Sequence, residues 1–357
     1  MTIPEKMSGM VLTGHGGFDK LEWREDLAVP HPGAGEVLIA VRASSVNNTD
    51  INTRTAWYSK SVRGGTASGA SAGNAEADAA DGGWSGQALN FPRIQGADCC
   101  GEIVAVGPAV PDSRIGERVL VRALQSTGAT GGPYATWTYG SECDGAFADY
   151  TKTFAADALP VHSDWSDIEL ASIPCAYATA EGMLQRAGLK NERVLITGAS
   201  GGVGSAAVQL SKRRGASVTA VTSADKAADI KALGADEIAM RDSALAEAAF
   251  DVVIDLVGGP RWPEMISALR RGGRYGTAGA IAGPIVELDL RSLYLRDLTL
   301  FGSTFQPDSI LPDVIGYIER QEIRPLIAQV FGLKDLHLAQ EAFLEKAHIG
   351  KIAIRNL

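Results

Sequence analysis

The feature that most constrains the fold is a glycine-rich segment, 197-TGASGGVGSAAVQL-210, which directly follows the apolar run 193-RVLIT-197. Glycine tolerates the backbone angles of a tight turn and lets backbone N–H groups approach a bound anion. Small residues then continue in a pattern that suits a helix. The segment therefore predicts a buried strand, a tight turn and a helix, which is how a βαβ unit begins. The glycines of the turn are Gly198, Gly201, Gly202 and Gly204.

Strands and helices are predicted to alternate on both sides of this turn. A helical pattern over 168–188 precedes it, and the expected helices after it are 203–214, 225–233 and 261–270. The expected strands are 193–197, 217–221, 236–240, 251–257, 273–279 and 298–304. Strands that alternate with helices form a parallel, doubly wound sheet. We therefore predict an α/β fold with a Rossmann-type domain over residues 167–305.

The N-terminal part has a different pattern, because short apolar runs alternate with Gly and Pro turns. The runs are 36-EVLIAVRA-43, 102-EIVAVG-107 and 117-ERVLVRA-123, which read as β-strands. A chain of 357 residues is too long for one ordinary hydrophobic core, so a second domain is expected. The last fifty residues read as a helix followed by short strands. We expect them to rejoin the N-terminal part in one domain, 1–166 and 306–357.

Residues 59–90 stand apart from the rest of the N-terminal domain. The segment contains GGTASGASAGNAEADAADGG, which is almost free of large apolar side chains. Such a composition buries too little surface to fold alone. We therefore predict an insertion in the form of a long, mobile loop.

The glycine turn predicts a dinucleotide site, and the next strand predicts which dinucleotide it takes. We assign the pyrophosphate to Gly198, Ser200, Gly201, Gly202, Val203 and Gly204. NAD sites place an acidic residue at the end of the second strand, whereas this strand ends in Thr222 and Ser223. Lys226 and Arg241 add positive charge for a 2′-phosphate, and Asp225 is read as a helix N-cap. The predicted cofactor is NADP(H).

Composition limits the partners. The net charge of −9 argues against a nucleic-acid or anionic-membrane surface as the main partner. No apolar run is long enough to span a bilayer, and MTIPEKMSGM lacks the features of a secretory signal. The four cysteines form no C-x-x-C pattern. We expect a cytoplasmic protein with a small-molecule partner, and neither nucleic acid nor membrane.

Several segments together resemble the medium-chain dehydrogenase/reductase superfamily, and within it the zinc-independent quinone oxidoreductase (zeta-crystallin-like) branch. They are 33-GAGEVLIAVRASSVNNTD-50, 96-GADCCGEIVAVG-107, 145-GAFADY-150, 197-TGASGGVGSAAVQL-210, 251-DVVIDLVGG-259 and 294-YLRDLTLFGST-304. The resemblance implies a GroES-like β domain followed by a Rossmann domain. It also implies a homodimer in which strand 298–304 pairs with its copy, which would protect an apolar edge strand.

The resemblance also bears on metal. The zinc-dependent relatives have their three catalytic ligands at the positions of Asn47, Ala97 and Cys175, so one ligand type of three remains. A catalytic zinc needs three protein ligands and an open position. We therefore predict no metal, and read Cys175 as a small buried residue.

The candidate catalytic residues follow the N-x-x-D pattern of that branch, Asn47 and Asp50. Asn47 is expected to donate its amide to substrate or nicotinamide, and Asp50 to orient its loop. The resemblance implies substrate binding by Arg54, a hydrogen bond or proton from Tyr58, and cofactor binding by Lys351. The alternative for Asn47 and Asp50 is a turn held by side-chain-to-backbone bonds.

Without a metal to stabilise an alkoxide, alcohol oxidation is disfavoured, whereas electron-poor acceptors need only placement and hydrogen bonds. The first hypothesis is an NADPH-dependent, zinc-independent oxidoreductase that transfers hydride to a quinone or activated alkene, such as an enone or enoyl thioester. Two alternatives stay open. One is an alcohol dehydrogenase with unusual zinc ligands, and the other is a non-catalytic NADPH-binding protein.

Overall fold

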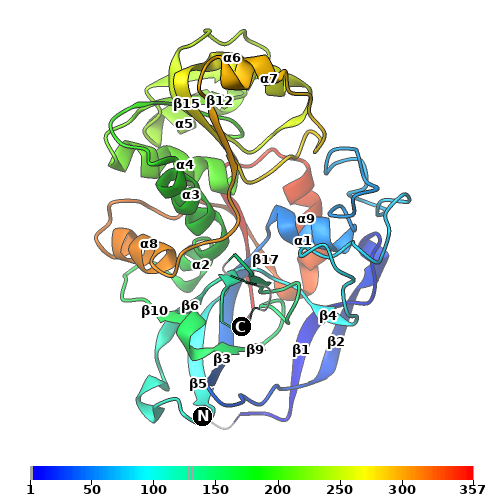
Figure 1. The fold of residues 1–357 in the computed structure, drawn as a ribbon. Helices are drawn as coiled ribbons and strands as arrows, with labels where there is room; N and C mark the ends of the chain where they lie inside the picture. The colour runs from blue at the N-terminus through cyan, green and yellow to red at the C-terminus, as the bar shows by residue number, and fades with distance from the viewer. Residues whose placement is uncertain (1–2, 128, 130–131, 133, 357) are drawn as a thin grey trace. The chain divides into compact units, whose positions relative to one another are not determined.

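The computed structural model describes residues 3–127, 129, 132 and 134–356 (Figure 1). The chain forms two compact units. The first comprises residues up to 62, 69–175 and 311 onward, and the second comprises 63–68 and 176–310. The division differs from the predicted boundaries in three ways. Residues 306–310, predicted for the first domain, belong to the second unit. Residues 167–175 stay with the first unit, and six residues of the insertion belong to the second.

The first unit is a β domain built mainly from antiparallel strands. Its largest sheet has the order β10-β6-β5-β3-β18-β17, with β9 also paired to β3, and a smaller sheet has the order β2-β1-β4. The strands of the large sheet are β3 (Glu36–Ser45), β5 (Cys100–Val106), β6 (Arg118–Val121), β9 (Tyr150–Phe154), β10 (Ala158–Pro160), β17 (Ile327–Gly332) and β18 (Lys351–Arg355). The others are β1 (Lys6–Leu12), β2 (Leu21–Ala28), β4 (Arg93–Ile94) and the pair β7 (Leu124–Gln125) and β8 (Trp137–Thr138).

The three apolar runs predicted as strands correspond to β3, β5 and β6, which are neighbours in this sheet. They are neighbours because one face of each packs into a common core that includes Val37, Ile103 and Val119. The helices of this unit are α1 (Asn48–Arg54), α2 (Asp167–Leu170), α8 (Ile310–Glu319, which begins one residue before the boundary) and α9 (Leu336–Leu344).

The last strand, β18, returns to the N-terminal sheet as expected and pairs antiparallel with β3. Ala353 stands opposite Ser45, so continuing the register by two residues places Lys351 opposite Asn47. On the other side of β3, Ala43 stands opposite Cys100. The same extrapolation places Asp98 opposite Ser45. The end of β3 is thus flanked by residues from two distant parts of the chain.

The second unit contains a six-stranded sheet in the order β13-β12-β11-β14-β15-β16, in which every pair is parallel. This is the strand order of a Rossmann domain, with β11 as the first strand. The strands are β11 (Arg193–Ile196), β12 (Ser217–Thr222), β13 (Glu237–Met240), β14 (Phe250–Asp255), β15 (Leu269–Thr277) and β16 (Thr299–Gly302). The α/β prediction is therefore confirmed.

The helices of the second unit follow the predicted alternation with two differences, one at its start and one at α7, which was not predicted. They are α3 (Pro174–Ala187, whose first two residues belong to the first unit), α4 (Gly202–Arg213), α5 (Ala227–Ala232), α6 (Trp262–Ala268) and α7 (Leu290–Tyr294). The single helix predicted over 168–188 is two helices, α2 and α3. Pro174 lacks a backbone N–H and suits the first position of a helix, so a new helix begins there.

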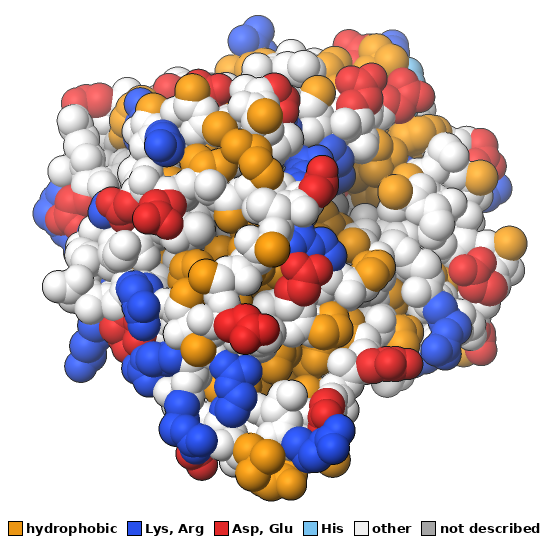
Figure 2. Space-filling model, turned by 90° about the horizontal axis from the view of Figure 1, so that it is seen from above, with side chains coloured by type: hydrophobic (Ala, Val, Ile, Leu, Met, Phe, Trp, Pro, Cys, Tyr) orange, Lys and Arg blue, Asp and Glu red, His pale blue; other side chains and the backbone are white. Residues whose placement is uncertain are grey.

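Short 3₁₀ turns complete the chain: η1 (Phe18–Lys20), η2 (Asp112–Arg114), η3 (Ala155–Asp157), η4 (Ala224–Lys226), η5 (Gly259–Arg261) and η6 (Leu333–Asp335). On the face shown in Figure 2, Lys and Arg side chains are interspersed with Asp and Glu side chains. Within the described ranges, none of the helices combines the length and the apolar character that a membrane span requires.

The insertion 59–90 contains turns and bends, without a helix or strand. It is nevertheless held by specific bonds within the first unit. The side chain of Asn74 donates to the carbonyl of Thr55 at 2.9 Å, and the backbone N–H of Asp78 donates to Ser59 Oγ at 3.0 Å. Because polar contacts replace a hydrophobic core, the segment is ordered without forming a domain of its own.

Candidate functional site

The glycine-rich turn has the geometry expected of a dinucleotide site. Helix α4 begins at Gly202 with Gly201 as its N-cap, and Gly198 has a φ of +61°. A Cβ on Gly204 would lie 2.1 Å from the carbonyl oxygen of Gly198 and 2.7 Å from Ala199 Cα. Only glycine fits this contact. It brings the first turn of α4 against the end of β11, where its N–H groups favour an anion. Ser200 and Val203 belong to the same turn.

A buried carboxylate, which the sequence reasoning missed, holds this region together. Asp255 is 1% exposed and accepts hydrogen bonds from the hydroxyls of Thr197 at 2.5 Å and Tyr275 at 2.7 Å. It also accepts from the backbone N–H groups of Val257 at 2.9 Å and Gly258 at 3.2 Å. Asp255 therefore links the glycine turn to the turn that follows β14. The motif 251-DVVIDLVGG-259 was the available signal, but nothing in it shows the partner Thr197.

The ribose end of the site combines hydroxyls with two cations. Thr222 ends β12 and Ser223 follows it. Lys226 is buried, and desolvation together with the nearby charge of Arg241 lowers the pKa of its ammonium group. Two cations close enough to oppose each other are stabilised by a bound anion. The predicted group Thr222, Ser223, Lys226 and Arg241 is thus gathered at one place.

The prediction that Asp225 is a helix N-cap was wrong. The cap of α5 is Lys226, the cap of η4 is Ser223, and Asp225 lies in the first turn of η4. Its exposed carboxylate accepts a hydrogen bond from the Ser223 side chain, which lowers its pKa. The chain tightens into a 3₁₀ turn before the α-helix starts, and this shifts the cap by one residue.

In the first unit, Asn47 lies at the end of β3 and caps helix α1. Its amide nitrogen donates to Asp98 Oδ2 at 2.8 Å and to the carbonyl of Ser45 at 3.3 Å. Its amide oxygen accepts from the ammonium of Lys351. Both ends of the amide are thus engaged within the protein. This geometry favours an organising role for Asn47 over the predicted donation to substrate or nicotinamide.

Asp98 is the centre of this polar cluster, and the sequence reasoning did not single it out. It is fully buried, and its Oδ2 also accepts from the Ser45 hydroxyl and from Lys351 Nζ, the latter at 2.9 Å. Its Oδ1 accepts from the backbone N–H of Cys175 at 2.7 Å. Lys351 is itself only 2% exposed, which disagrees with the predicted cofactor contact. The acid in 96-GAD-98 was visible, but its partners were not.

Asp50 is buried beside this cluster and orients the loop, as its predicted role requires. Its carboxylate accepts from the backbone N–H of Asn47 at 2.7 Å and from that of Ala97 at 3.3 Å. Burial raises the pKa of the carboxyl to about 7, although these two bonds and the charge of Lys351 act in the opposite direction. Asp50 therefore joins the start of α1 to the segment before β5.

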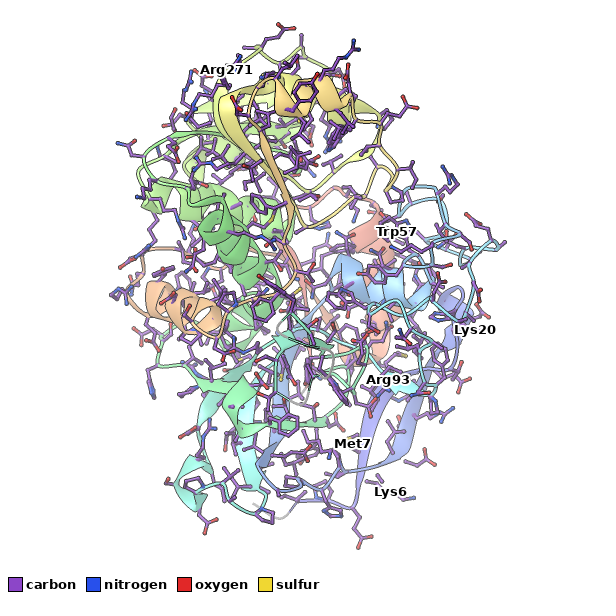
Figure 3. All side chains as sticks on the ribbon, viewed as in Figure 1. Lys6, Met7, Lys20, Trp57, Arg93 and Arg271 are labelled. Atoms are coloured by element: carbon purple, nitrogen blue, oxygen red, sulfur yellow. The ribbon has the colours of Figure 1, made fainter. Side chains whose placement is uncertain are left out.

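Tyr58 follows helix α1 and is only partly buried, so its hydroxyl remains a candidate donor. The hydroxyl donates to Thr49 Oγ1 at 3.1 Å, and burial raises the pKa of Tyr58 to about 12. Trp57, labelled in Figure 3, packs edge-on against the Tyr58 ring with centroids 5.8 Å apart. The phenol is therefore held in place and stays protonated at neutral pH. Thr49, which the sequence reasoning missed, belongs to the same group.

Arg54 is completely buried, which disagrees with the predicted substrate contact. Its guanidinium donates to Gln340 Oε1 at 3.0 Å and to the carbonyls of Gly16 at 2.9 Å and Ala70 at 2.8 Å. It also lies over the ring of Phe18, 4.4 Å from its centroid. Since Ala70 belongs to the insertion, this geometry favours a structural role in which Arg54 anchors that segment to α9.

Replacing Arg54 by Met is expected to destabilise the protein by about 3 kcal/mol, because three buried acceptors lose their donor. Urea unfolding measures this, and limited proteolysis should show earlier cleavage within 59–90. Arg271→Met is the matched control, because Arg271 is 70% exposed and its ion pair with Asp297 is worth little. If Arg54→Met keeps full stability and raises only the KM for substrate, the substrate-binding prediction holds instead.

The residues present do not fit a catalytic zinc. Asn47 and Ala97 offer no thiolate or imidazole, and Asn47 Oδ1 faces an ammonium group. Cys175 is partly exposed rather than fully buried, and desolvation raises the pKa of its thiol, which disfavours the thiolate that metals bind. Among the described residues, no group of three His, Cys, Asp or Glu side chains is arranged to hold a metal ion.

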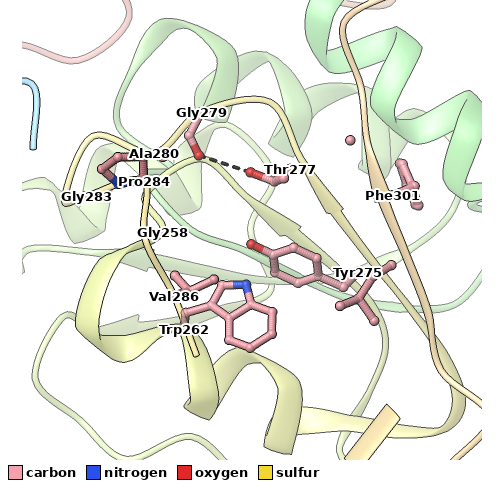
Figure 4. Close-up of a pocket in the computed structure, with 12 residues that line it drawn as sticks. Gly258, Trp262, Tyr275, Thr277, Gly279, Ala280, Gly283, Pro284, Val286 and Phe301 are labelled. Atoms are coloured by element: carbon pink, nitrogen blue, oxygen red, sulfur yellow. Dashed lines mark hydrogen bonds between the residues drawn. The ribbon is translucent and has the colours of Figure 1, made fainter. Parts of the chain in front are cut away.

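The second unit has a pocket of about 310 Å³ (Figure 4). Trp262 and Tyr275 stand edge-to-face on its wall with centroids 5.8 Å apart, and Thr277 donates to the carbonyl of Gly279 at 3.0 Å. Leu300 and Phe301 of strand β16 complete the apolar side. The wall is therefore mainly aromatic and aliphatic, with glycines of the turns after β14 and β15.

Comparison with known proteins gives two family models. Residues 33–163 match the alcohol dehydrogenase GroES-like domain, and residues 202–320 match the zinc-binding dehydrogenase domain. A solved structure from Sinorhizobium meliloti, provisionally named an alcohol dehydrogenase, superposes with a TM-score of 0.86. It is 41% identical to this chain, and the match covers 99% of this chain and 97% of that one.

Two curated relatives carry names that state a reaction. The acryloyl-coenzyme A reductase of Metallosphaera sedula is 28% identical over 98% of this chain and 99% of its own length. The NADPH-dependent alkenal/one oxidoreductase of Arabidopsis thaliana chloroplasts is 27% identical over 91% of this chain and 73% of its own length. Both names refer to substrates that contain a C=C bond and a carbonyl group.

Proposed function

Because the chain belongs to the medium-chain dehydrogenase/reductase superfamily, we propose that it is an NADP(H)-dependent oxidoreductase that transfers hydride to an activated alkene. The observation that carries the cofactor is the pair Lys226 and Arg241 near Thr222 and Ser223, because β12 ends in these hydroxyls where NAD sites have a carboxylate. The nearby carboxylate of Asp225 lies in the turn η4 and accepts a hydrogen bond from Ser223. The substrate class is supported by the relatives that reduce acryloyl-CoA and alkenals. Enones and enoyl thioesters are favoured over quinones for that reason.

NADPH, when bound, would supply the hydride for the β carbon of the double bond, and water would supply the proton for the α carbon. The carbonyl oxygen gains negative charge in between, and a hydrogen-bond donor there lowers the barrier. The Tyr58 hydroxyl is the donor proposed for this role, because its pKa of about 12 keeps it protonated. Its single proton is directed at Thr49 Oγ1 in the free protein, so the O–H has to turn from Thr49 to the carbonyl oxygen when substrate binds. Asn47 and Asp50 form the capping box at the start of helix α1, which contains Thr49 and precedes Tyr58.

The reaction proposed here is zinc-independent. In such an acceptor the C=C bond is conjugated with the carbonyl group, so its β carbon is electron-poor and can accept hydride. The reaction therefore needs no Lewis acid to stabilise an alkoxide. The oxygen atoms of Asn47 and Asp98 support a zinc-independent reaction, because Asn47 Oδ1 and Asp98 Oδ2 already accept hydrogen bonds from the Lys351 ammonium.

The test is an NADPH-oxidation screen over quinones, enones and enoyl-CoA esters. We expect the largest kcat/KM with an enone or enoyl-CoA ester, and a loss of tenfold or more in kcat for Tyr58→Phe at unchanged NADPH affinity. If NADPH binds tightly and no acceptor increases its oxidation, the protein is a non-catalytic NADPH-binding protein. If Tyr58→Phe leaves turnover unaltered on the best acceptor, the phenol is not the donor.

Removing the charge of Arg241 is expected to weaken NADPH binding about tenfold and to leave NADH binding unchanged, because one phosphate contact is worth about 1.4 kcal/mol. Calorimetry on Arg241→Met measures this. The matched control is Lys231→Met, an exposed cation on α5, which should leave both affinities unchanged. Ser223→Asp should reverse the preference, because a carboxylate repels the 2′-phosphate. Equal or tighter binding of NADH by the unchanged protein would exclude this assignment.

A homodimer through strand β16 is part of the proposal. Within the described chain, β16 pairs with β15 on one edge only. Large apolar side chains in the segment that precedes β16 are exposed, and in a monomer such side chains invite association. They are Ile285 (55%), Leu290 (64%), Tyr294 (62%) and Leu295 (55%).

Light scattering after size exclusion should therefore give twice the protomer mass for the unchanged protein. The double variant Leu290→Asp/Tyr294→Asp should give the mass of one protomer, because two carboxylates cannot be buried in an apolar interface. Val330→Asp, at an exposed site of β17 in the other unit, is the control and should remain dimeric. A monomeric unchanged protein would refute the proposal.

A further inference from the structure

The polar cluster at the end of β3 is built around one cation. We call it the Lys351 cluster, and it comprises Ser45, Asn47, Asp98 and Lys351. The Lys351 ammonium donates to Asn47 Oδ1 and to Asp98 Oδ2. The side chains of the ion pair are 3% exposed for Lys351 and 0% for Asp98. The cluster is thus a buried cation with oxygen atoms directed at it.

Asp98 makes a cation at this position necessary. A buried carboxylate is stable only when it is paired and its lone pairs are used. Its four donors are the Ser45 hydroxyl, the Asn47 amide, the Cys175 N–H and the Lys351 ammonium, and only the last carries a full positive charge. Lys351 therefore neutralises a charge that the fold places in its interior.

Asp98 Oδ2 is also an atom of a type that metal ions bind. A zinc ion binds carboxylate oxygen at about 2.0–2.2 Å. An ion at that distance from Asp98 Oδ2 would lie within a few ångströms of Lys351 Nζ, itself 2.9 Å from that oxygen. At about 4 Å, two unit charges oppose each other by about 4 kcal/mol at an effective dielectric constant of 20, and a dication by about twice that. The Lys351 ammonium therefore opposes the binding of a divalent ion at this oxygen.

The strand register makes this arrangement a property of the fold. Lys351 begins β18 and stands opposite Asn47, where the pairing of β18 with β3 continues. The backbone N–H of Val46 donates to the carbonyl of Ile352 at 2.9 Å, which fixes the two strands at this point. The ammonium cannot leave the cluster without breaking this pairing or rotating its side chain through packed residues.

We propose that the Lys351 ammonium is the resident cation of this site, which takes the place of a divalent metal ion, neutralises Asp98 and keeps metal ions out. The proposal rests on the zinc-independent function above and deepens it, because it names the group that replaces the metal. It predicts that metal affinity depends on the charge at position 351 more than on the ligands alone.

The experiment restores the ligand types that zinc prefers and then varies position 351. Three proteins carry Asn47→Cys and Ala97→His, one with Lys351 kept, one with Lys351→Met and one with Lys351→Arg. Zinc per protomer is measured by mass spectrometry after gel filtration, Kd by chelator competition, and cobalt binding by the thiolate absorption band. We expect one zinc in the Met protein, with a Kd at least 100-fold lower than in the Lys and Arg proteins. Equal Kd values in the three would overturn the proposal.

Two further measurements keep the test decisive if the restored proteins do not fold. Lys351→Met alone is compared with the unchanged protein in thermal melts with and without zinc. We expect zinc to raise the Tm of the Met variant only, because it replaces the lost counter-charge of Asp98. Stoichiometric zinc in the unchanged protein, lost on Asn47→Ala, would overturn the proposal. These readouts need no turnover, so a failed acceptor screen leaves them unaffected.

Discussion

Replacing Asp98 by Ala is expected to lower the free energy of unfolding by about 3–5 kcal/mol, because the change leaves the Lys351 ammonium buried without a counter-charge. The amide of Asn47, the hydroxyl of Ser45 and the N–H of Cys175 lose an acceptor at the same time. Each unsatisfied buried donor adds its desolvation cost. The loss should therefore exceed that of an ordinary ion pair several-fold.

Urea unfolding at neutral pH measures the change, and a double-mutant cycle separates its causes. Asp98→Ala/Lys351→Met should be more stable than the sum of the two single changes predicts, by 2 kcal/mol or more, because neither charge is then left alone. Glu22→Ala removes a half-exposed partner of Arg24 and should change stability by less than about 0.5 kcal/mol. If the stability losses of the two single variants add up to the loss of the double variant, Asp98 and Lys351 do not stabilise each other.

Replacing Gly204 by Val is expected to weaken NADPH binding more than 100-fold. A Cβ here would lie 2.1 Å from the Gly198 carbonyl oxygen and 2.7 Å from Ala199 Cα. Both atoms belong to the backbone and cannot rotate away as a side chain could. Helix α4 would have to move away from β11, which displaces the N–H groups that face the pyrophosphate. The effect should appear in affinity even where the second unit still folds.

Calorimetry with NADPH measures the affinity, and circular dichroism checks the fold. Gly182→Ala is the matched control, since Gly182 lies inside helix α3 and an added Cβ would approach nothing closer than 3.7 Å. That change should preserve affinity and leave stability equal or slightly higher. If Gly204→Val binds NADPH within threefold of the unchanged protein, the turn is not the pyrophosphate site.

Local pattern was sufficient for the second unit. The run 193–197 and the glycines after it predicted β11, the turn and α4, and the later alternation predicted the parallel sheet. These features depend on neighbours in sequence, because backbone freedom and periodicity act over a few residues. Two predictions for this part of the chain were wrong, and the cause of each was also local in sequence. Pro174 divided the helix predicted over 168–188, and the 3₁₀ turn at Ala224–Lys226 displaced the cap expected at Asp225.

The candidate residues of the first unit were found, but their roles were not. Arg54 and Lys351 are both polar groups in segments that resemble a known family, and both were expected to touch small molecules. Both side chains are buried, which favours structural roles, because a charged side chain without solvent must find its partners inside the protein. Those partners are distant in sequence, since Gln340 lies 286 positions after Arg54.

The sequence by itself determined the glycine turn, the α/β class, the hydroxyls and cations at the ribose position, and the loss of two zinc-ligand types at Asn47 and Ala97. Only the tertiary structure decided what stands there instead. Lys351 lies 304 residues after Asn47, and the two meet because β18 pairs with β3 in one register. Strand register depends on the packing of whole sheets, and a short motif carries no information about it.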